Sequence, residues 1–303
     1  MRKTNSFIIT AVAFLVSFSG IAQQLADTLY TPVIENPNYE KGQGPTLLLD
    51  EAHGNFHTLS GRFQPFAKVL EKDGYVVDAS SAPFTSEHLR NGKILVIANA
   101  LDASNLQEWT LPTPSAFTDS EIDAVNEWVK EGGSLFLIAD HMPFPGAAEK
   151  LAASFGFKFY NGFAMKKGGA KDIFSSGNGL IDNLVTKGRN EKETITSVQT
   201  FTGQAFEIPK NAQPIIVLNS KYEVKMPKTA WQFEKDTPTI SAENLAQGAY
   251  MDYGKGKIVV FGEAAMFTAQ RQGKNEVGMN QKSASQNLQL LLNLIHWLDG
   301  TLN

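Results

Sequence analysis

The sequence contains no cysteine among its 303 residues. Disulfides, thiolate nucleophiles and thiolate-bound metals are therefore excluded for this chain. Charge is also sparse, because Asp, Glu, Lys and Arg make up only 19% of the residues and the formal net charge is −4. No basic stripe is present, so we expect no nucleic-acid partner.

Long apolar runs are scarce, and the most conspicuous one opens the chain. A basic start, Arg2-Lys3, precedes an apolar stretch over residues 7–18, and Gly20-Ile21-Ala22 supplies the small residues that signal peptidase reads. The stretch is short for a membrane span, which needs about 20 apolar residues. We expect residues 1–22 to be a cleaved signal peptide, with an uncleaved anchor as the alternative. The protein would then be periplasmic or secreted, with no membrane span after cleavage.

The rest of the chain reads as one domain. Residues 23–43 are polar and contain three prolines or glycines, which predicts an extended lead-in. Residues 44–303 are long enough for one large core. Residues 162–212 are rich in Gly, Ser and Thr and interrupt the alternation of strands and helices, so we interpret them as an insertion rather than a second domain.

Four apolar runs predict buried strands, and helical patterns lie between them. The runs are Thr46–Asp50, Tyr75–Val77, Lys93–Ala98 and Ser134–Ala139, and the helical segments are Ser60–Lys72, a helix opened by the Thr118/Glu121 capping box, and Gly146–Phe155. A hairpin is predicted around residues 254–256, and a last helix over Ser283–Leu298. This order favours an α/β fold, a three-layer sandwich with a mainly parallel sheet.

Polar residues follow three of these strands, where ligands bind in open parallel sheets. Asp50, His53, Asn55 and His57 follow the first, Asp140 and His141 follow the fourth, and Glu263 follows a late strand. If the first and fourth strands are neighbours, these side chains converge on one pocket. We take His53, Asp140, His141 and Glu263 as candidate catalytic residues, and Asp50, Asn55, His57, Arg189 and Asn280 as candidate ligand-binding residues.

Three interpretations of this cluster remain open. His and carboxylate ligands with one open position would suit a divalent metal such as Zn²⁺, although no cofactor is certain. A metal-free site would use a His as general base, oriented by Asp50 or Asp140. In the third interpretation the residues are structural or bind a ligand without catalysis: Asp140 caps a helix, His53 satisfies loop backbone groups, and Glu263 is an acid at a helix N-terminus.

Four segments together carry a resemblance to a known fold family. They are Asp50-Glu51-Ala52-His53-Gly54-Asn55, Thr200-Phe201-Thr202-Gly203-Gln204-Ala205-Phe206, the segment from Gly262 to Gln270, and His296-Trp297-Leu298. They resemble an uncharacterised bacterial family that looks like a branch of the class I glutamine amidotransferase-like fold, a flavodoxin-like sandwich, over roughly residues 44–300. The resemblance implies the fold but not the reaction, because working amidotransferases carry a nucleophilic Cys where this chain has Asp140-His141-Met142-Pro143.

Relatives of that fold include trehalose-utilisation-type proteins and non-catalytic domains attached to glycosidases, so the resemblance implies a small-molecule or glycan ligand. We expect an exported hydrolase-like enzyme with a His/carboxylate pocket, acting on carbohydrate. The alternative is a non-catalytic ligand-binding or scaffold protein of the cell envelope.

Overall fold

The structure is a computed structural model, and it describes residues 24–169 and 171–303. The expected signal peptide, residues 1–22, lies outside the described residues. In the part of the chain that is described, no helix has the length and apolar character needed to cross a membrane.

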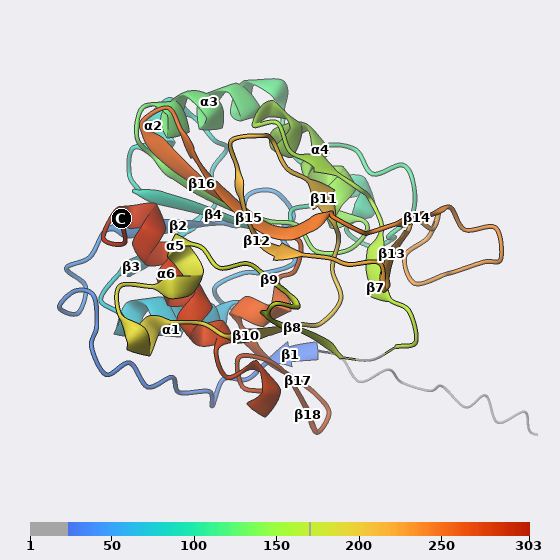
Figure 1. Cartoon of the computed structure of the whole chain (residues 1–303). Coiled ribbons are helices and arrows are strands. Elements are labelled where there is room, and N and C mark those ends of the chain that lie inside the picture. The colour runs from blue at the N-terminus through green and yellow to red at the C-terminus, as the bar shows by residue number, and fades with distance from the viewer. Residues whose placement is uncertain (1–23, 170) are drawn as a thin grey trace, which may run out of the picture.

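Five neighbouring strands form the parallel half of a large sheet (Figure 1). In spatial order they are β3 (Val76–Ser80), β2 (Thr46–Asp50), β4 (Ile94–Ala98), β5 (Ser134–Ile138) and β16 (Gly256–Phe261). Every residue of β4 and β5 is buried, as their continuous apolar sequences predict for strands covered on both faces.

The other half of the sheet is built mostly from antiparallel pairs. It continues from β16 through β15 (Ala246–Tyr253), β12 (Gln213–Val217), β9 (Gly179–Leu180), β8 (Asp172–Ser176) and β10 (Ser197–Thr200). The predicted hairpin around residues 254–256 is confirmed, because β15 pairs antiparallel with β16. The α/β class is confirmed too, but the sheet is mixed rather than mainly parallel, since this half is not built from strand–helix–strand crossovers.

Residues 162–212 contribute several of these strands. Besides β8, β9 and β10, this segment contains β7 (Phe163–Lys166), β11 (Phe206–Glu207), the short helix α5 (Leu184–Lys187) and the 3₁₀ turn η2 (Glu191–Glu193). β11 pairs with β15 and with β6 (Lys158–Phe159), whereas β7 joins β13 (Tyr222–Lys225) and β14 (Thr239–Ser241) in a separate sheet. The segment therefore contributes strands to the large sheet and to the separate sheet.

Helices cover both faces of the parallel half, as Figure 1 shows. α1 (Gln64–Lys72) and α6 (Asn287–Asp299) pack on one face, and α2 (Ser86–Leu89), α3 (Asp119–Lys130) and α4 (Phe144–Ser154) pack on the other. Successive strand residues point to opposite faces. Val96 thus joins the core under α1 and α6, and Leu95 and Ile97 join the core under α3 and α4.

The lead-in is tied to the domain at its start. β1 (Gln24–Ala26) pairs with β17 (Ala269–Gln272), which pairs with β18 (Asn275–Gly278). The lead-in then has no regular structure up to β2, but Tyr30, Ile34 and Tyr39 pack against the core that contains α1 and α6. The remaining short elements are 3₁₀ turns, η1 (Ala103–Asn105), η3 (Ala265–Phe267) and η4 (Lys282–Ala284).

Candidate functional site

The strand order divides the expected cluster. β4 lies between β2 and β5, so the first and fourth predicted strands are not neighbours. With strands about 4.8 Å apart, the ends of β2 and β5 are about 10 Å apart. Asp50 and His53, which follow β2, are therefore separated from Asp140 and His141, which follow β5.

The first group is a closed network around His53. His53 Nδ1 lies 2.8 Å from Asp50 Oδ1, and His53 Nε2 lies 2.9 Å from Glu121 Oε1 in the first turn of α3. Asn55 donates to Asp50 Oδ2, and Thr118 donates twice to Glu121 Oε2. All of these residues except Asn55 and Thr118 are buried. The network joins the loop after β2 to α3.

The network makes His53 a cation rather than a base. Both ring nitrogens face carboxylate oxygens, which only accept hydrogen bonds, so both nitrogens carry protons. Burial lowers the pKa of His53, but the hydrogen bonds and charges of Asp50 and Glu121 raise it above its ordinary value. Burial raises the pKa of Glu121, but hydrogen bonds from Thr118 and His53 outweigh it and lower the pKa to about 2. This geometry matches a structural role for His53 and leaves no ring nitrogen to accept a proton.

The second group lies after β4 and β5 and is organised by Asn99. Its Oδ1 accepts from the Asp140 backbone N–H at 2.8 Å, and its Nδ2 donates to His57 Nδ1 at 3.2 Å. Asn99 has a φ of 54°, a left-handed conformation that Asn tolerates better than most residues. It brings His57 from the first loop to the Asp140-His141 turn.

The two imidazoles of this group differ in burial and in hydrogen bonding. Burial, with smaller contributions from the charges of Arg62 and His141, lowers the pKa of His57 to about 3, so His57 is neutral at physiological pH. His141 donates from Nδ1 to the Met142 carbonyl at 2.7 Å, so its other ring nitrogen, Nε2, is the one left for a ligand. His141 is half-buried, and Nε2 has no hydrogen-bond partner among the described residues.

Glu263 adjoins Asp140 because β16 is the neighbour of β5. Its two oxygens accept the backbone N–H groups of Ala265 and Met266, both at 2.8 Å, at the start of η3. The side chain is 1% exposed. Burial and the negative charge of Asp140 raise the pKa of Glu263 well above its ordinary value, against the two backbone hydrogen bonds. Asp140 itself does not cap α4, which has no side-chain cap.

A tight loop packs beside Glu263. Thr202 has a φ of 111°, which is unusual for a β-branched residue, and a Cβ at Gly203 would lie 2.1 Å from the Gly262 carbonyl oxygen. Next in the chain, Gln204 donates from Nε2 to the Ala139 carbonyl at 2.9 Å. Backbone strain of this kind is concentrated at functional sites in many proteins.

Aromatic side chains surround His141. The ring of Phe163 stacks on it at 4.6 Å and 12°, and the ring of Trp231 meets it edge-on at 4.7 Å. Trp109 and Phe144 lie within 6 Å of the same imidazole. Trp231 is 51% exposed with a φ of 66°, and Ala230 next to it is hydrogen-bonded to the Trp109 backbone. We call these four aromatic residues with His141 the aromatic wall.

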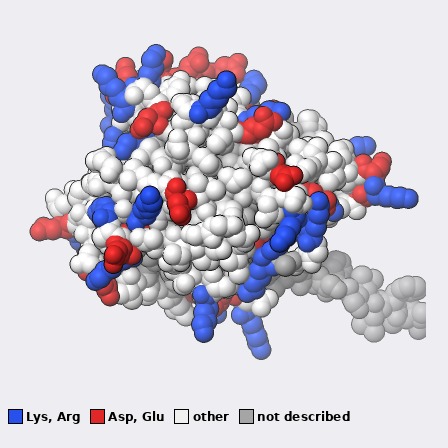
Figure 2. All heavy atoms as spheres, viewed as in Figure 1, with Lys and Arg blue, Asp and Glu red and all other residues white. Residues whose placement is uncertain are grey.

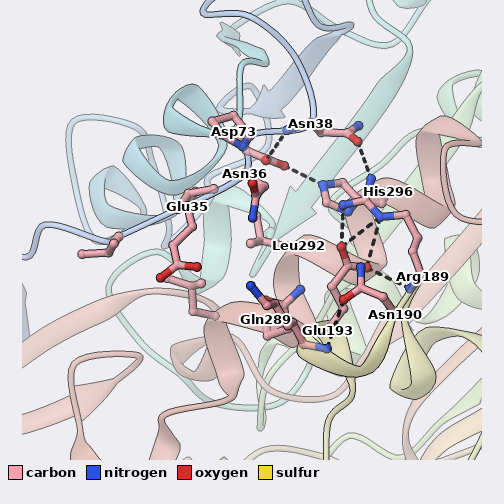
Figure 3. A pocket seen from close by; sticks show the side chains of 15 residues that line it. Glu35, Asn36, Asn38, Asp73, Arg189, Asn190, Glu193, Gln289, Leu292 and His296 are labelled. Carbon is pink, nitrogen blue, oxygen red and sulfur yellow. Dashed lines mark hydrogen bonds and ion pairs between the residues drawn. The ribbon is translucent and has the colours of Figure 1, made fainter.

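Two predicted ligand-binding residues lie away from the strand ends. Arg189 lines a cavity beside α6 and pairs with Glu193 at 2.7 Å (Figure 3). Asn280 donates to Asp27 and to the Gln270 carbonyl, and so fastens the lead-in to β17. The structure does not bring either of them to Asp140 and His141.

The sequence analysis did not select three residues that lie at or next to the Asp140-His141 turn. Asn99 follows the third predicted strand directly, so the rule that selected Asp50 and Asp140 could have selected it. Gln204 lies in the segment Thr200–Phe206, which we noted only as a resemblance. Trp231 lies in a loop and follows no periodic pattern, so no sequence signal pointed to it.

Within residues 24–169 and 171–303, no group of three or more His, Asp or Glu side chains is placed to hold a metal ion. Figure 2 shows acidic and basic side chains interspersed on the face it presents, around a broad uncharged area.

Comparison with known families and with curated proteins finds no match to this chain. Solved structures do match. A chain described as the mmIFT52 N-terminal domain aligns with a TM-score of 0.59 and 15% identity, over 84% of this chain and 97% of that one. Two cytoplasmic proteins from Salmonella typhimurium align with a TM-score of 0.50, at 12% and 13% identity, over 84% of this chain and 98% of each of theirs.

These alignments show a shared fold and nothing about activity, because the identities are very low. A thua-like protein from Bacteroides uniformis aligns with a TM-score of 0.47, which is too low to carry an argument. The chain is thus an α/β protein, and the solved structures that share its fold are described as different kinds of protein.

Proposed function

We propose that this chain is an exported, non-catalytic protein that binds a glycan at the aromatic wall. The observation that carries the proposal is the free Nε2 of His141 beside the exposed ring of Trp231. Asp140 adds a second acceptor, because within the described residues only its Oδ1 accepts a hydrogen bond, from the His141 N–H. Sugars present hydroxyl donors around an apolar ring face, so acceptors next to aromatic faces suit them.

Recognition accounts for the groups at this end of the sheet better than hydrolysis does. His53 has no free ring nitrogen, and Glu263 is 1% exposed with both oxygens on backbone N–H groups. A general acid must reach the bond that it protonates. The groups that remain accessible are a carboxylate oxygen of Asp140 and Nε2 of His141, which suit hydrogen bonds to hydroxyl groups.

A hydrolase is the second candidate, and one observation favours it. The raised pKa of Glu263 would keep this carboxyl protonated, as a general acid requires. The loop with Thr202 and Gly203, which packs over Glu263, would have to move for a substrate to reach it.

The finer fold assignment and the location are part of the proposal. We propose that the fold belongs to the class I glutamine amidotransferase-like group without its Cys, on the segments that carry the resemblance. Export rests on the pattern of residues 1–22. Mass analysis of the protein recovered from its native cell envelope or medium tests export: a mature chain beginning near Gln23 is expected, and an intact chain confined to the cytoplasm would refute it.

Glycan binding is tested on an immobilised glycan library, followed by calorimetric titration of the best free oligosaccharide. We expect Trp231→Ala and His141→Ala each to weaken binding at least about tenfold. Leu29→Ala, which removes an apolar side chain that is 85% exposed on the lead-in, is the matched control and should leave binding unchanged. Binding that survives both wall variants would refute the site.

The same oligosaccharide distinguishes the two candidates. Incubation followed by measurement of new reducing ends should show no cleavage if the protein only binds. Cleavage that is abolished in Glu263→Gln while binding remains would establish the hydrolase instead.

A further inference from the structure

A second site lies beside α6, away from the aromatic wall. It is a cavity of about 710 Å³ between lead-in residues 33–38, the segment 189–193 and one side of α6 (Figure 3). This volume is within the range of small-molecule sites. Nothing in the proposed glycan-binding function uses this cavity.

The wall formed by Asp73 and His296 is rigid. His296 Nε2 lies 2.6 Å from Asp73 Oδ2, and the Asn38 backbone N–H donates to Asp73 Oδ1 at 2.8 Å. Asp73 and His296 are 0% and 2% exposed. The lead-in is thereby fixed to α6 through side chains that cannot easily rearrange, so the cavity is preformed.

Arg189 is held in a defined orientation at the same cavity. Its Nε and Nη2 donate to Glu193, and its Nη1 donates to Asn38 Oδ1 at 2.6 Å. A guanidinium has five N–H groups. Two of them therefore remain without a partner in the part of the chain that the structure describes, and they are positioned without loss of further side-chain freedom.

Two exposed charges of opposite sign complete the lining. Glu35 stands on the lead-in and Lys192 on η2, and neither side chain pairs with any residue of 24–169 or 171–303. Figure 3 shows Glu35 and Arg189 on opposite sides of Leu292. Leu288 and Leu292 add apolar surface to the lining.

We propose that this cavity binds a short zwitterionic peptide. The ligand's carboxylate lies at Arg189 and Lys192, its ammonium group at Glu35, and an apolar side chain on Leu288 and Leu292. Separated charges of opposite sign match a zwitterion. A ligand with a single charge would meet one of the two lining charges with the same sign as its own. A neutral polyol would make no use of either charge.

The probe is leucyl-leucine, titrated into the purified protein by calorimetry. Its end-blocked forms, N-acetyl-leucyl-leucine and leucyl-leucinamide, each lack one charge. Glu35→Gln and Lys192→Gln remove the two opposed charges from exposed positions. Glu191→Gln and Lys187→Gln are the matched controls, because both residues are exposed neighbours that do not line the cavity.

We expect leucyl-leucine to bind, each blocked form to bind at least about tenfold more weakly, and each lining variant to weaken binding by a similar factor. The two controls should bind like the unaltered protein. The proposal is overturned if leucyl-leucine does not bind, if the blocked forms bind as well as the free dipeptide, or if the controls weaken binding as much as the lining variants do.

Discussion

The His53 network gives the sharpest stability prediction. His53→Ala removes two hydrogen bonds to carboxylates, each of which contributes about 1.5–3 kcal/mol. It also leaves Asp50 and Glu121 buried without their shared cation, and breaking a buried ion pair in this way costs about 3–5 kcal/mol. We therefore expect a loss of about 3–5 kcal/mol in the free energy of unfolding, or about 10 °C in melting temperature.

Urea unfolding followed by circular dichroism measures this loss. His88→Ala is the control, because the half-buried His88 ring bonds only to Ser80 Oγ within the described residues, so its loss should cost about 0.5–1.5 kcal/mol. In a double-mutant cycle, adding Glu121→Gln to His53→Ala should cost much less than it does in the unaltered protein. A loss below about 1 kcal/mol for His53→Ala would refute the network as a stabilising element.

The pH dependence of the same variant has a defined sign. The pKa of His53 is raised in the folded state, so its stabilisation is fully present below its unfolded pKa of about 6.5 and is lost as pH rises through the folded pKa. The difference between the unaltered protein and His53→Ala should therefore shrink as the pH rises above about 6.5. A difference that grows over this range would contradict a protonated His53.

Three further predictions concern neighbouring residues. Because the pKa of Glu121 is lowered to about 2, its stabilisation should be lost as pH falls from about 4.5 to about 2, and acid unfolding of Glu121→Gln should lack that component. Because the pKa of Glu263 is raised, its ionisation should destabilise the fold as pH rises above about 4.5. Urea unfolding of Glu263→Gln and of the unaltered protein at about pH 5 and about pH 8 tests this. The variant should gain stability relative to the unaltered protein at the higher pH. Thr202→Gly should raise the melting temperature slightly or leave it unchanged, because relief of about 1–3 kcal/mol of backbone strain outweighs or offsets the entropy cost of glycine. Gly203→Ala should lower the melting temperature sharply. A large loss of stability in Thr202→Gly would show that the φ of 111° at Thr202 is not strained.

Local patterns in the sequence predicted the parallel half of the sheet well. The apolar run Thr46–Asp50 coincides with β2, and the Thr118/Glu121 capping box opens α3 as expected. Both features depend on residues a few positions apart, so sequence alone contains them. The antiparallel half was not predicted, because β8 and β9 are strands of only five and two residues whose pairing with β10 and β12 depends on contacts far along the chain.

The candidate site was predicted less well because its outcome depends on strand order. Asp140 and Glu263 do interact, as expected for two of the predicted cluster residues, because β5 and β16 are neighbours in the structure. Asp50 and His53 separate from them because β4 lies between β2 and β5. Glu121 could be recognised as a local cap, but its bond to His53, 68 positions away, could not.

Polar residues at strand ends can stabilise the fold or bind a ligand. The two roles differ in how many hydrogen-bonding atoms of the side chain are left without a partner inside the described part of the protein. His53 uses both ring nitrogens internally, whereas His141 keeps Nε2 free in a half-exposed ring beside Trp231. Proton-transfer catalysis needs a donor and an acceptor that both reach the reacting bond. The accessible atoms here, a carboxylate oxygen of Asp140 and Nε2 of His141, lie beside aromatic rings, whereas Glu263, a carboxyl with a raised pKa, is buried beneath a loop. For that reason the chemistry of this end of the sheet favours recognition of a hydroxyl-bearing ligand over its cleavage.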